Sequence, residues 1–371
     1  MKTILEITKN TNSRSKLTAM GWSDFFQEEI DFDYTPARVV SVNKDIFQLS
    51  QGEEELQATL SGRIRYKAGL PGEGELFPVT GDWVLIEDSR IIKVLPRRNV
   101  LSRGASGGRG KREDQSAEEQ VMAANLDTVL IVCGLDRDYN VRRIERYLTL
   151  VYNCNLAPVV VLSKGDLHAE PLACVEEIES VAFSVPVHLV SANDEAGILE
   201  LEKYLTPGKT VSMVGSSGAG KSTLLNRLYG QHVQDTGCVS KSVGKGMHTT
   251  TGRDLIVMPQ GGMLIDNPGI REIAFYTNNG GASEAFVDIE DYARYCRFAD
   301  CDHLNDPGCN VLRAVDQGEL SPERLESYYK MKRELTYITQ RRNKSADRVE
   351  KERWREIALQ NKKLKKRNKN R

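Results

Sequence analysis

The chain has 371 residues, of which 40% are hydrophobic and 28% charged, as in a folded protein with several domains. No stretch approaches the roughly 20 apolar residues that a membrane span needs, and the N-terminus lacks the apolar core and cleavage site of a secretory signal. Seven cysteines do not make a disulfide framework in a chain of this length. The composition therefore predicts a cytoplasmic protein without membrane contact.

The charge is distributed unevenly along the chain. The net charge is −1, but residues 331–371 hold 16 Lys and Arg against 5 Asp and Glu, which gives this tail +11 and leaves −12 for the remainder. A basic tail on an acidic body often marks contact with a polyanion. It can equally be a solubilising end of a helix, and the charge alone leaves both interpretations open.

The residue pattern changes twice within the first 120 residues. Residues 1–35 are an N-terminal extension without an assignable pattern, whereas residues 36–101 contain short apolar runs broken by turn residues, which predicts a small β-barrel of the OB-fold type. Residues 102–120, rich in Gly, Ser and Arg, are expected to be a flexible basic linker. The runs expected as barrel strands are 37–42, 45–50, 56–66, 82–88 and 90–96.

From residue 121 to 280, apolar runs of four to seven residues alternate with helix-like segments. Strands that are apolar throughout and alternate with helices predict a parallel sheet covered on both faces, here at 128–134, 157–166, 186–192 and 209–215. Two last runs, at 254–259 and 261–269, are separated by so short a turn that we expect an antiparallel hairpin. Residues 281–371 are polar and are predicted to be mostly helical.

The segment GSSGAGKST matches the P-loop pattern and stands, as that pattern requires, between an apolar strand and a helix. Small residues allow the backbone N–H groups to surround phosphate oxygens at a helix N-terminus. Lys221 would neutralise the β- and γ-phosphates, and the Ser222 hydroxyl would bind Mg²⁺. The predicted phosphate-binding residues are Gly215, Ser216, Ser217, Gly218, Ala219, Gly220, Lys221, Ser222 and Thr223.

A second motif suggests which base is bound. Asp166 follows a buried strand in a run similar to the N/T-K-x-D motif, and its carboxylate would accept the two N–H donors that guanine offers and adenine lacks. Lys164 would lie over the base plane. At the end of the next predicted strand, Ser191 and Ala192 fit a further base-contacting motif, S-A. The predicted base-binding residues are Ser163, Lys164, Gly165, Asp166, Ser191 and Ala192.

Two further segments complete a GTPase site. Asp266 and Gly269 fit the D-x-x-G motif, in which Asp266 would hold Mg²⁺ through water and the Gly269 amide would sense the γ-phosphate. Among the three threonines at 249–251 we favour Thr250 as the residue that closes over Mg²⁺. Because the base motifs precede the P-loop in this chain, the sequence predicts a circularly permuted GTPase.

The residue that orients the attacking water is not the Gln found after D-x-x-G in many GTPases. That position is Ile270, which cannot form a hydrogen bond through its side chain. His248 directly precedes the threonines expected to close over the γ-phosphate, and an imidazole can orient a water or share its proton. His248 is therefore the predicted catalytic residue.

The pattern C-x4-C-x-H-x5-C opens the last part of the chain. Three thiolates and one imidazole suit a tetrahedral zinc ion, and four protein ligands leave no open position, which predicts a structural site with one zinc per chain. Its ligands would be Cys296, Cys301, His303 and Cys309. The other cysteines are scattered and are expected to be apolar core residues.

The β-barrel, the permuted motifs and this cluster together resemble the ribosome small-subunit-dependent GTPases, the RsgA (YjeQ) family, over residues 36–310. The resemblance implies a multidomain protein with an OB-fold, a permuted α/β GTPase domain and a C-terminal helical zinc domain. It implies a monomer that binds GTP, GDP and Mg²⁺, docks on the 30S subunit and its 16S rRNA late in maturation, and hydrolyses GTP slowly until the subunit stimulates it. Ser163 and Asn267 depart from the family's pattern.

Two other functions are compatible with the motifs. The first is a P-loop enzyme that acts on another substrate with ATP, such as a small-molecule kinase, which a comparison of GTP and ATP binding would test. The second is a non-catalytic RNA-binding module with a structural GTP, which a turnover assay would test.

Overall fold

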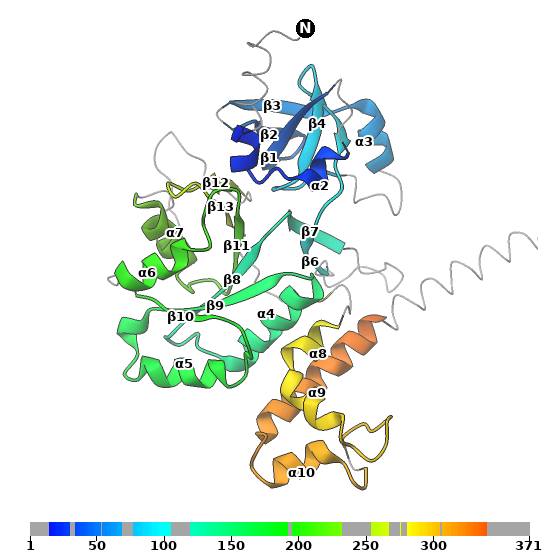
Figure 1. Cartoon of the computed structure of the whole chain (residues 1–371), viewed down its shortest axis with the longest axis vertical. Coiled ribbons are helices and arrows are strands. Elements are labelled where there is room, and N and C mark those ends of the chain that lie inside the picture. Colours follow the sequence, from blue (N-terminus) through cyan, green and yellow to red (C-terminus); the bar gives the residue numbers. More distant parts are fainter. Residues whose placement is uncertain are drawn as a thin grey trace, which may run out of the picture.

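The computed structural model describes residues 15–29, 34–52, 54–68, 77–104, 119–191, 195–231, 254–266, 275, 280–304 and 306–339. Figure 1 shows three bodies along the long axis of the molecule: a barrel at one end, a sheet with helices in the middle, and a helical body at the other end. The order of these bodies follows the order of the sequence.

The N-terminal body is a closed barrel with the strand order β1-β2-β3-β5-β4. This confirms the predicted small barrel. Its strands are β1 (Thr35–Asn43), β2 (Ile46–Ser50), β3 (Glu55–Leu60), β4 (Trp83–Glu87) and β5 (Arg90–Val94).

One barrel segment differs from the prediction. The run 56–66 was expected to be a single strand, but the chain leaves β3 at Leu60 and forms helix α3 (Gly62–Ala68). The Ser61 hydroxyl accepts a hydrogen bond from the Ile64 amide at 3.5 Å, as a residue preceding a helix does. Only Ile64 is buried, so one apolar side chain suffices to seat this short helix on the barrel.

The central body is a six-stranded sheet with the order β10-β9-β8-β11-β13-β12. All neighbours pair in parallel except β12 and β13, which form the expected antiparallel hairpin. The strands are β8 (Thr128–Gly134), β9 (Ala157–Ser163), β10 (Val187–Leu189), β11 (Thr210–Val214), β12 (Leu255–Val257) and β13 (Met263–Asp266).

Helices cover both faces of this sheet, as the uniformly apolar strands predicted. Alternate residues of β8 separate the two cores: Ile131 packs with α4 and α5, whereas Leu130 packs with α6 and α7. The helices are α4 (Val141–Asn153), α5 (Pro171–Glu179), α6 (Glu195–Glu202) and α7 (Lys221–Tyr229). The predicted parallel sheet is therefore confirmed.

The barrel is fastened to the sheet by a buried arginine and a strand bridge. Arg38 of β1 donates hydrogen bonds to the carbonyl oxygens of Met20, Gly81 and Asn125, and its guanidinium also lies 3.1 Å from the sulfur of Met263 in β13. Ser41 of β1 forms an antiparallel bridge with Asp254, directly before β12. These contacts connect the barrel to the hairpin that carries Asp266.

Part of the N-terminal extension covers this junction. Trp22 and Phe26, on either side of the start of α2 (Asp24–Gln27), are buried against Trp83, with ring centres 4.7 and 5.9 Å from it. The two ends of the expected linker, β6 (Val100–Gly104) and β7 (Glu119–Ala124), pair as antiparallel strands. Residues 105–118 lie outside the described part of the chain.

The C-terminal body is helical where the structure describes it. It contains α8 (Gly281–Ala285), α9 (Val287–Ala293), α10 (Asn310–Asp316) and a helix at 322–339, while 340–371 lie outside the described residues. Helix α8 lies directly against α4, where the Gly281 amide donates a hydrogen bond to the Asn153 side chain at 3.0 Å. Among the described residues, no helix is long and apolar enough to cross a membrane.

Candidate functional site: a nucleotide pocket and a Cys/His cluster

The P-loop connects β11 to α7 and needs glycine at its start. At Gly215, φ is +151° and a Cβ atom would lie 2.2 Å from the carbonyl oxygen of Val132 in the neighbouring strand β8. Gly218 and Gly220 have φ values of +86° and +89°, which other residues rarely adopt. The glycines therefore allow the loop to turn tightly at the carboxyl end of the sheet.

Lys221 begins α7 and points back into this loop. Its Nζ donates hydrogen bonds to the carbonyl oxygens of Gly215 and Ser216 at 2.8 and 2.6 Å. Burial lowers the pKa of the Lys221 ammonium, and the carboxylates of Asp266 and Asp138 oppose this shift. Added negative charge from a phosphate would favour the charged ammonium further.

Asp266 ends β13 and lies beside the base of the P-loop. In the parallel pairing of β11 with β13, Met213 stands opposite Asp266, so this carboxyl group is two residues from the level of Gly215. Asp266 is buried. This position suits a carboxylate that approaches Mg²⁺ next to the phosphates.

The base motif is tied to the P-loop by a serine. The Ser163 hydroxyl, at the end of β9, is buried and donates a hydrogen bond to the carbonyl oxygen of Ala219 at 2.6 Å. Asp166 is exposed in the short turn Gly165–Leu167, where its carboxylate is accessible to a base. Ser163 thus joins two loops of the site, and its contact with the nucleotide stays a prediction.

Four predicted site residues lie outside the described residues: Ala192, His248, Thr250 and Gly269. The other predicted nucleotide-binding residues come together at the carboxyl ends of β9, β11 and β13, and Ser191 follows β10 at the same edge. Ligands of open α/β sheets bind at this edge. The structure therefore unites the described motifs, which are up to about a hundred residues apart in sequence.

Sequence reasoning missed two acidic residues at the same edge. Asp136 and Asp138 follow β8; Asp136 accepts a hydrogen bond from Lys164, and Asp138 accepts one from the Ser216 hydroxyl and one from Arg143. The hydrogen bond from Lys164 lowers the pKa of the Asp136 carboxyl group. The signal was present, because LDRD directly follows a strand that is apolar throughout.

The predicted metal ligands do converge. One ligand atom from each of four residues lies within 4.8 Å of all the others. The His303 Nδ1 lies 3.6 Å from the Cys296 Sγ and 3.5 Å from the Cys309 Sγ. Three sulfurs and one nitrogen at such distances fit one tetrahedral metal ion. The cluster consists of Cys296, Cys301, His303 and Cys309.

The surroundings of the cluster favour a thiolate at Cys296. Burial opposes ionisation of this thiol, but hydrogen bonds from the backbone amides of Asn310 and Val311 lower its pKa overall. The Leu312 amide donates to the Cys309 Sγ at 3.4 Å in the same way. Amide N–H groups directed at sulfur are the outer contacts that a thiolate metal site requires.

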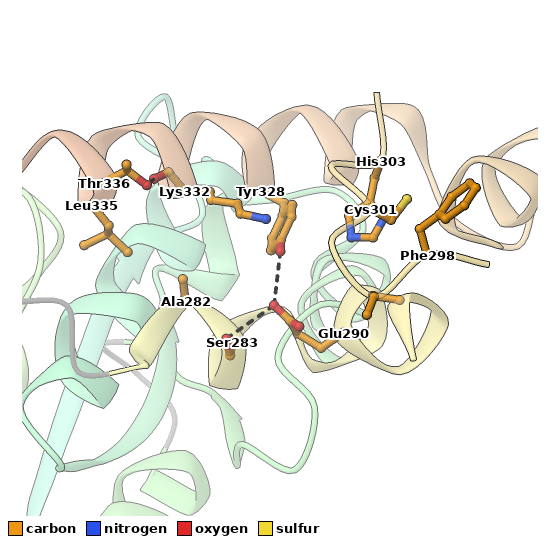
Figure 2. A pocket seen from close by; sticks show the side chains of 12 residues that line it. Ala282, Ser283, Glu290, Phe298, Cys301, His303, Tyr328, Lys332, Leu335 and Thr336 are labelled. Carbon is orange, nitrogen blue, oxygen red and sulfur yellow. Dashed lines mark hydrogen bonds between the residues drawn. The ribbon is translucent and has the colours of Figure 1, made fainter. Parts of the chain in front are cut away.

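A cavity of about 340 Å³ borders the cluster on one side. Figure 2 shows Glu290 in it, accepting hydrogen bonds from the hydroxyls of Ser283 at 3.3 Å and Tyr328 at 3.1 Å. Lys332 and Thr336 of the last helix line the opposite side. The residues that line it all belong to the C-terminal body, so the cavity is separate from the nucleotide pocket.

The fold and these sites define a class of protein. A P-loop strand flanked by the Asp266 strand and by the strands that precede the base motif is the arrangement of a P-loop GTPase, and the order of the motifs along the chain makes it a circularly permuted one. A barrel precedes this domain and a helical body with a Cys/His cluster follows it (Figure 1).

Comparisons with known proteins agree with this class. The family model "RsgA GTPase" matches residues 94–276. A protein of Methanosarcina acetivorans named small ribosomal subunit biogenesis GTPase RsgA is 42% identical, covering 93% of this chain and 92% of that protein. A protein of the same name from Syntrophotalea carbinolica is 40% identical, covering 92% and 96%.

Solved structures show the same fold. The crystal structure of YjeQ from Thermotoga maritima superposes with a TM-score of 0.58 at 28% identity, covering 82% of this chain and 99% of that one. YloQ, a circularly permuted GTPase, superposes with a TM-score of 0.55 at 22% identity, covering 83% and 96%, and supports the fold alone. The ABC transporter family model also matches residues 199–369, a range that contains the P-loop found in many nucleotide-binding families.

Relatives at about 40% identity over more than nine-tenths of the chain decide the assignment. The chain belongs to the RsgA GTPase family and is a GTP-hydrolysing enzyme.

Proposed function

We propose that this protein acts in the late maturation of the small ribosomal subunit, binding the 30S particle with GTP and leaving it after hydrolysis. The observation that carries the proposal is the match, over more than nine-tenths of this chain, to relatives named small ribosomal subunit biogenesis GTPases. Barrel, GTPase domain and Cys/His cluster are all present in this chain, so every part that such a function uses has a counterpart here.

The nucleotide site follows from the motifs and their positions. Lys221 neutralises the β- and γ-phosphates, Asp166 selects guanine, and the hydroxyls of Ser222 and Thr250 with the Asp266 carboxylate hold Mg²⁺. The Gly269 amide senses the γ-phosphate, and Ser191 and Ala192 flank the base. His248 orients the attacking water. The contacts of Lys221 with loop carbonyls support this assignment, since a phosphate can replace them.

The metal of the Cys/His cluster is zinc, with a structural role. Zinc favours sulfur and nitrogen ligands in a tetrahedral arrangement, and four protein ligands leave no position for a reacting molecule. The cluster joins the turn after α9 to the start of α10, where Cys309 directly precedes the helix. A metal there fixes the turns of the C-terminal body that carry its ligands.

In this proposal the protein contacts RNA on the surface of the small subunit. The tail at 331–371 carries +11, and 16S rRNA is the polyanion that a small-subunit factor meets. We expect the protein to act as a cytoplasmic monomer, with one GTP and one subunit per chain.

Co-sedimentation with separated ribosomal subunits tests this proposal. The protein with a non-hydrolysable GTP analogue should pellet with small subunits and stay in the supernatant with large subunits. Binding to small subunits should weaken with GDP and with rising salt, because phosphate contacts release counterions. Equal binding to both subunits, or to neither, would refute the proposed partner.

A further inference from the structure

Helix α4 is connected to the P-loop through one carboxylate. Arg143, in the first turn of α4, donates a hydrogen bond to Asp138, and Asp138 in turn accepts a hydrogen bond from the hydroxyl of Ser216. Ser216 also offers its carbonyl oxygen to the Lys221 ammonium at 2.6 Å. The lysine that meets the phosphates is therefore three contacts away from α4.

The next turn of α4 holds the C-terminal body. Arg324 donates a hydrogen bond to the Glu145 carboxylate at 2.7 Å, and both side chains are buried. Arg146 forms two hydrogen bonds with Glu334, at 2.6 and 3.1 Å. One short helix thus carries the contacts to the P-loop and those to the C-terminal body.

The buried part of this connection is held from several sides. Arg324 also binds the Asp288 carboxylate at 2.9 Å and the carbonyl oxygen of Ala285 at 2.8 Å, and its guanidinium lies 4.3 Å from the centre of the Phe286 ring. A buried carboxylate that loses its guanidinium partner is strongly unfavourable. Separating α4 from the C-terminal body is therefore costly, so we expect a shift of that body to carry α4 with it.

We propose that Asp138 is a positioning residue for the P-loop, and that through α4 it makes nucleotide affinity depend on how the C-terminal body is seated. A shift of α4 moves Asp138 through Arg143, which displaces Ser216 and changes where the Lys221 ammonium lies when phosphate arrives. Coupling between two sites is reciprocal, so bound nucleotide must change the seating of the C-terminal body to the same extent. The proposal is independent of the identity of the partner.

A double-mutant cycle on GDP affinity tests the coupling. Glu334→Gln weakens the partly exposed ion pair with Arg146, through which the C-terminal body contacts α4. The affinity for Mg²⁺-GDP should change by about two- to thirty-fold, which is the range of effects that substitutions in such contact networks have on coupling. In an Asp138→Asn background the same substitution should change it by less than about 1.5-fold, because the connection is already broken. In an Arg143→Gln background, the effect of Glu334→Gln on GDP affinity should be reduced to the same extent.

The matched control is Glu326→Gln on the same helix. Glu326 pairs with Lys330 at 2.7 Å in an exposed i,i+4 contact, and it meets α4 through a longer-range attraction to Arg142 that solvent screens. Its loss should therefore change GDP affinity by less than about 1.5-fold. Hydrogen exchange of the helix at 322–339 should slow when GDP binds to the parent protein and should not respond in Asp138→Asn. Effects of Glu334→Gln that are the same with and without Asp138, or the same as those of Glu326→Gln, would overturn the proposal.

Discussion

The proposed base-selecting residue, Asp166, is exposed in a turn at the edge of the sheet, so its substitution leaves the core intact. In Asp166→Asn one acceptor oxygen becomes an N–H donor that faces a donor of guanine. Losing a hydrogen bond to a charged group should weaken GTP binding by about tenfold or more. Titration with a fluorescent GTP analogue measures the effect.

Xanthosine triphosphate provides the control for this prediction. Its 2-oxo group accepts the hydrogen bond that the side-chain amide of the Asp166→Asn variant would donate, so the variant should bind it better than the parent protein does. If the parent protein binds ATP and GTP equally well, Asp166 does not select the base.

His248 is the proposed catalytic residue and lies outside the described residues. His248→Ala should keep GTP affinity and small-subunit binding but lose about 10²-fold or more of the subunit-stimulated turnover, the usual effect of a positioned acid–base group. Single-turnover hydrolysis with and without subunits measures this. Unchanged stimulated turnover would transfer the role to a group supplied by the partner.

At the scale of the elements, the contact between α4 and α8 depends on one glycine. A Cβ atom at Gly281 would lie 2.5 Å from the Asn153 backbone nitrogen and 2.6 Å from the Thr149 carbonyl oxygen, both in α4. Gly281→Ala should therefore push α8 away and lower the free energy of unfolding by about 1–3 kcal/mol. Chemical denaturation measures the loss, and limited proteolysis should release the C-terminal body.

Gly62→Ala is the matched substitution. No atom lies within 4 Å of the Cβ position there, and alanine is the better helix former, so stability should stay the same or rise slightly. Equal stability of the Gly281→Ala and Gly62→Ala proteins would show that α8 does not pack closely on α4 in solution.

The Cys/His cluster makes a prediction about metal content. Elemental analysis should find one zinc per chain, and Cys301→Ser should lose it while the GTPase sheet keeps its circular dichroism signal. Without the metal, the turns that hold Cys296 and His303 lose the bonds through which the four ligand side chains are joined, so they should become sensitive to protease. Protein purified without chelator that contains no zinc would contradict the assignment.

Much of the central fold could be predicted from local pattern. The run TVLIVCG is apolar throughout, as a strand buried on both faces is, and the glycines of the P-loop stand where positive φ is required. Local pattern failed at residues 62–66, where alternating Arg and apolar residues predicted a strand but belong to helix α3. With Ile64 as the one buried residue of α3, the sequence shows too few apolar positions to distinguish the helical repeat from the alternation of a strand.

Contacts between distant segments were not predictable from local pattern. Arg324 meets Glu145 across 179 positions of sequence, and Ser216 meets Asp138 across 78. Charged residues on helices are mostly solvated, so nothing in the sequence distinguishes these buried or bridging ones from their neighbours. The acidic pair at 136 and 138 differs from these, because it directly follows the apolar strand β8 and its position could have indicated a place beside the phosphate-binding loop.

At the scale of the whole molecule, the GTPase sheet is fastened to a neighbour on each side. Arg38 and the bridge from Ser41 to Asp254 connect it to the barrel, and Arg324 connects it to the C-terminal body. A partner that holds the outer two bodies therefore also constrains the nucleotide site between them. This arrangement suits an enzyme whose turnover depends on what it is bound to.

GTP turnover with purified ribosomal subunits tests this account most directly. The protein alone should hydrolyse GTP slowly, and isolated small subunits should raise the rate by about tenfold or more, as activating partners of GTPases do. Large subunits at the same concentration should have no effect. A rate that is the same with small subunits, with large subunits and with no addition would contradict the account.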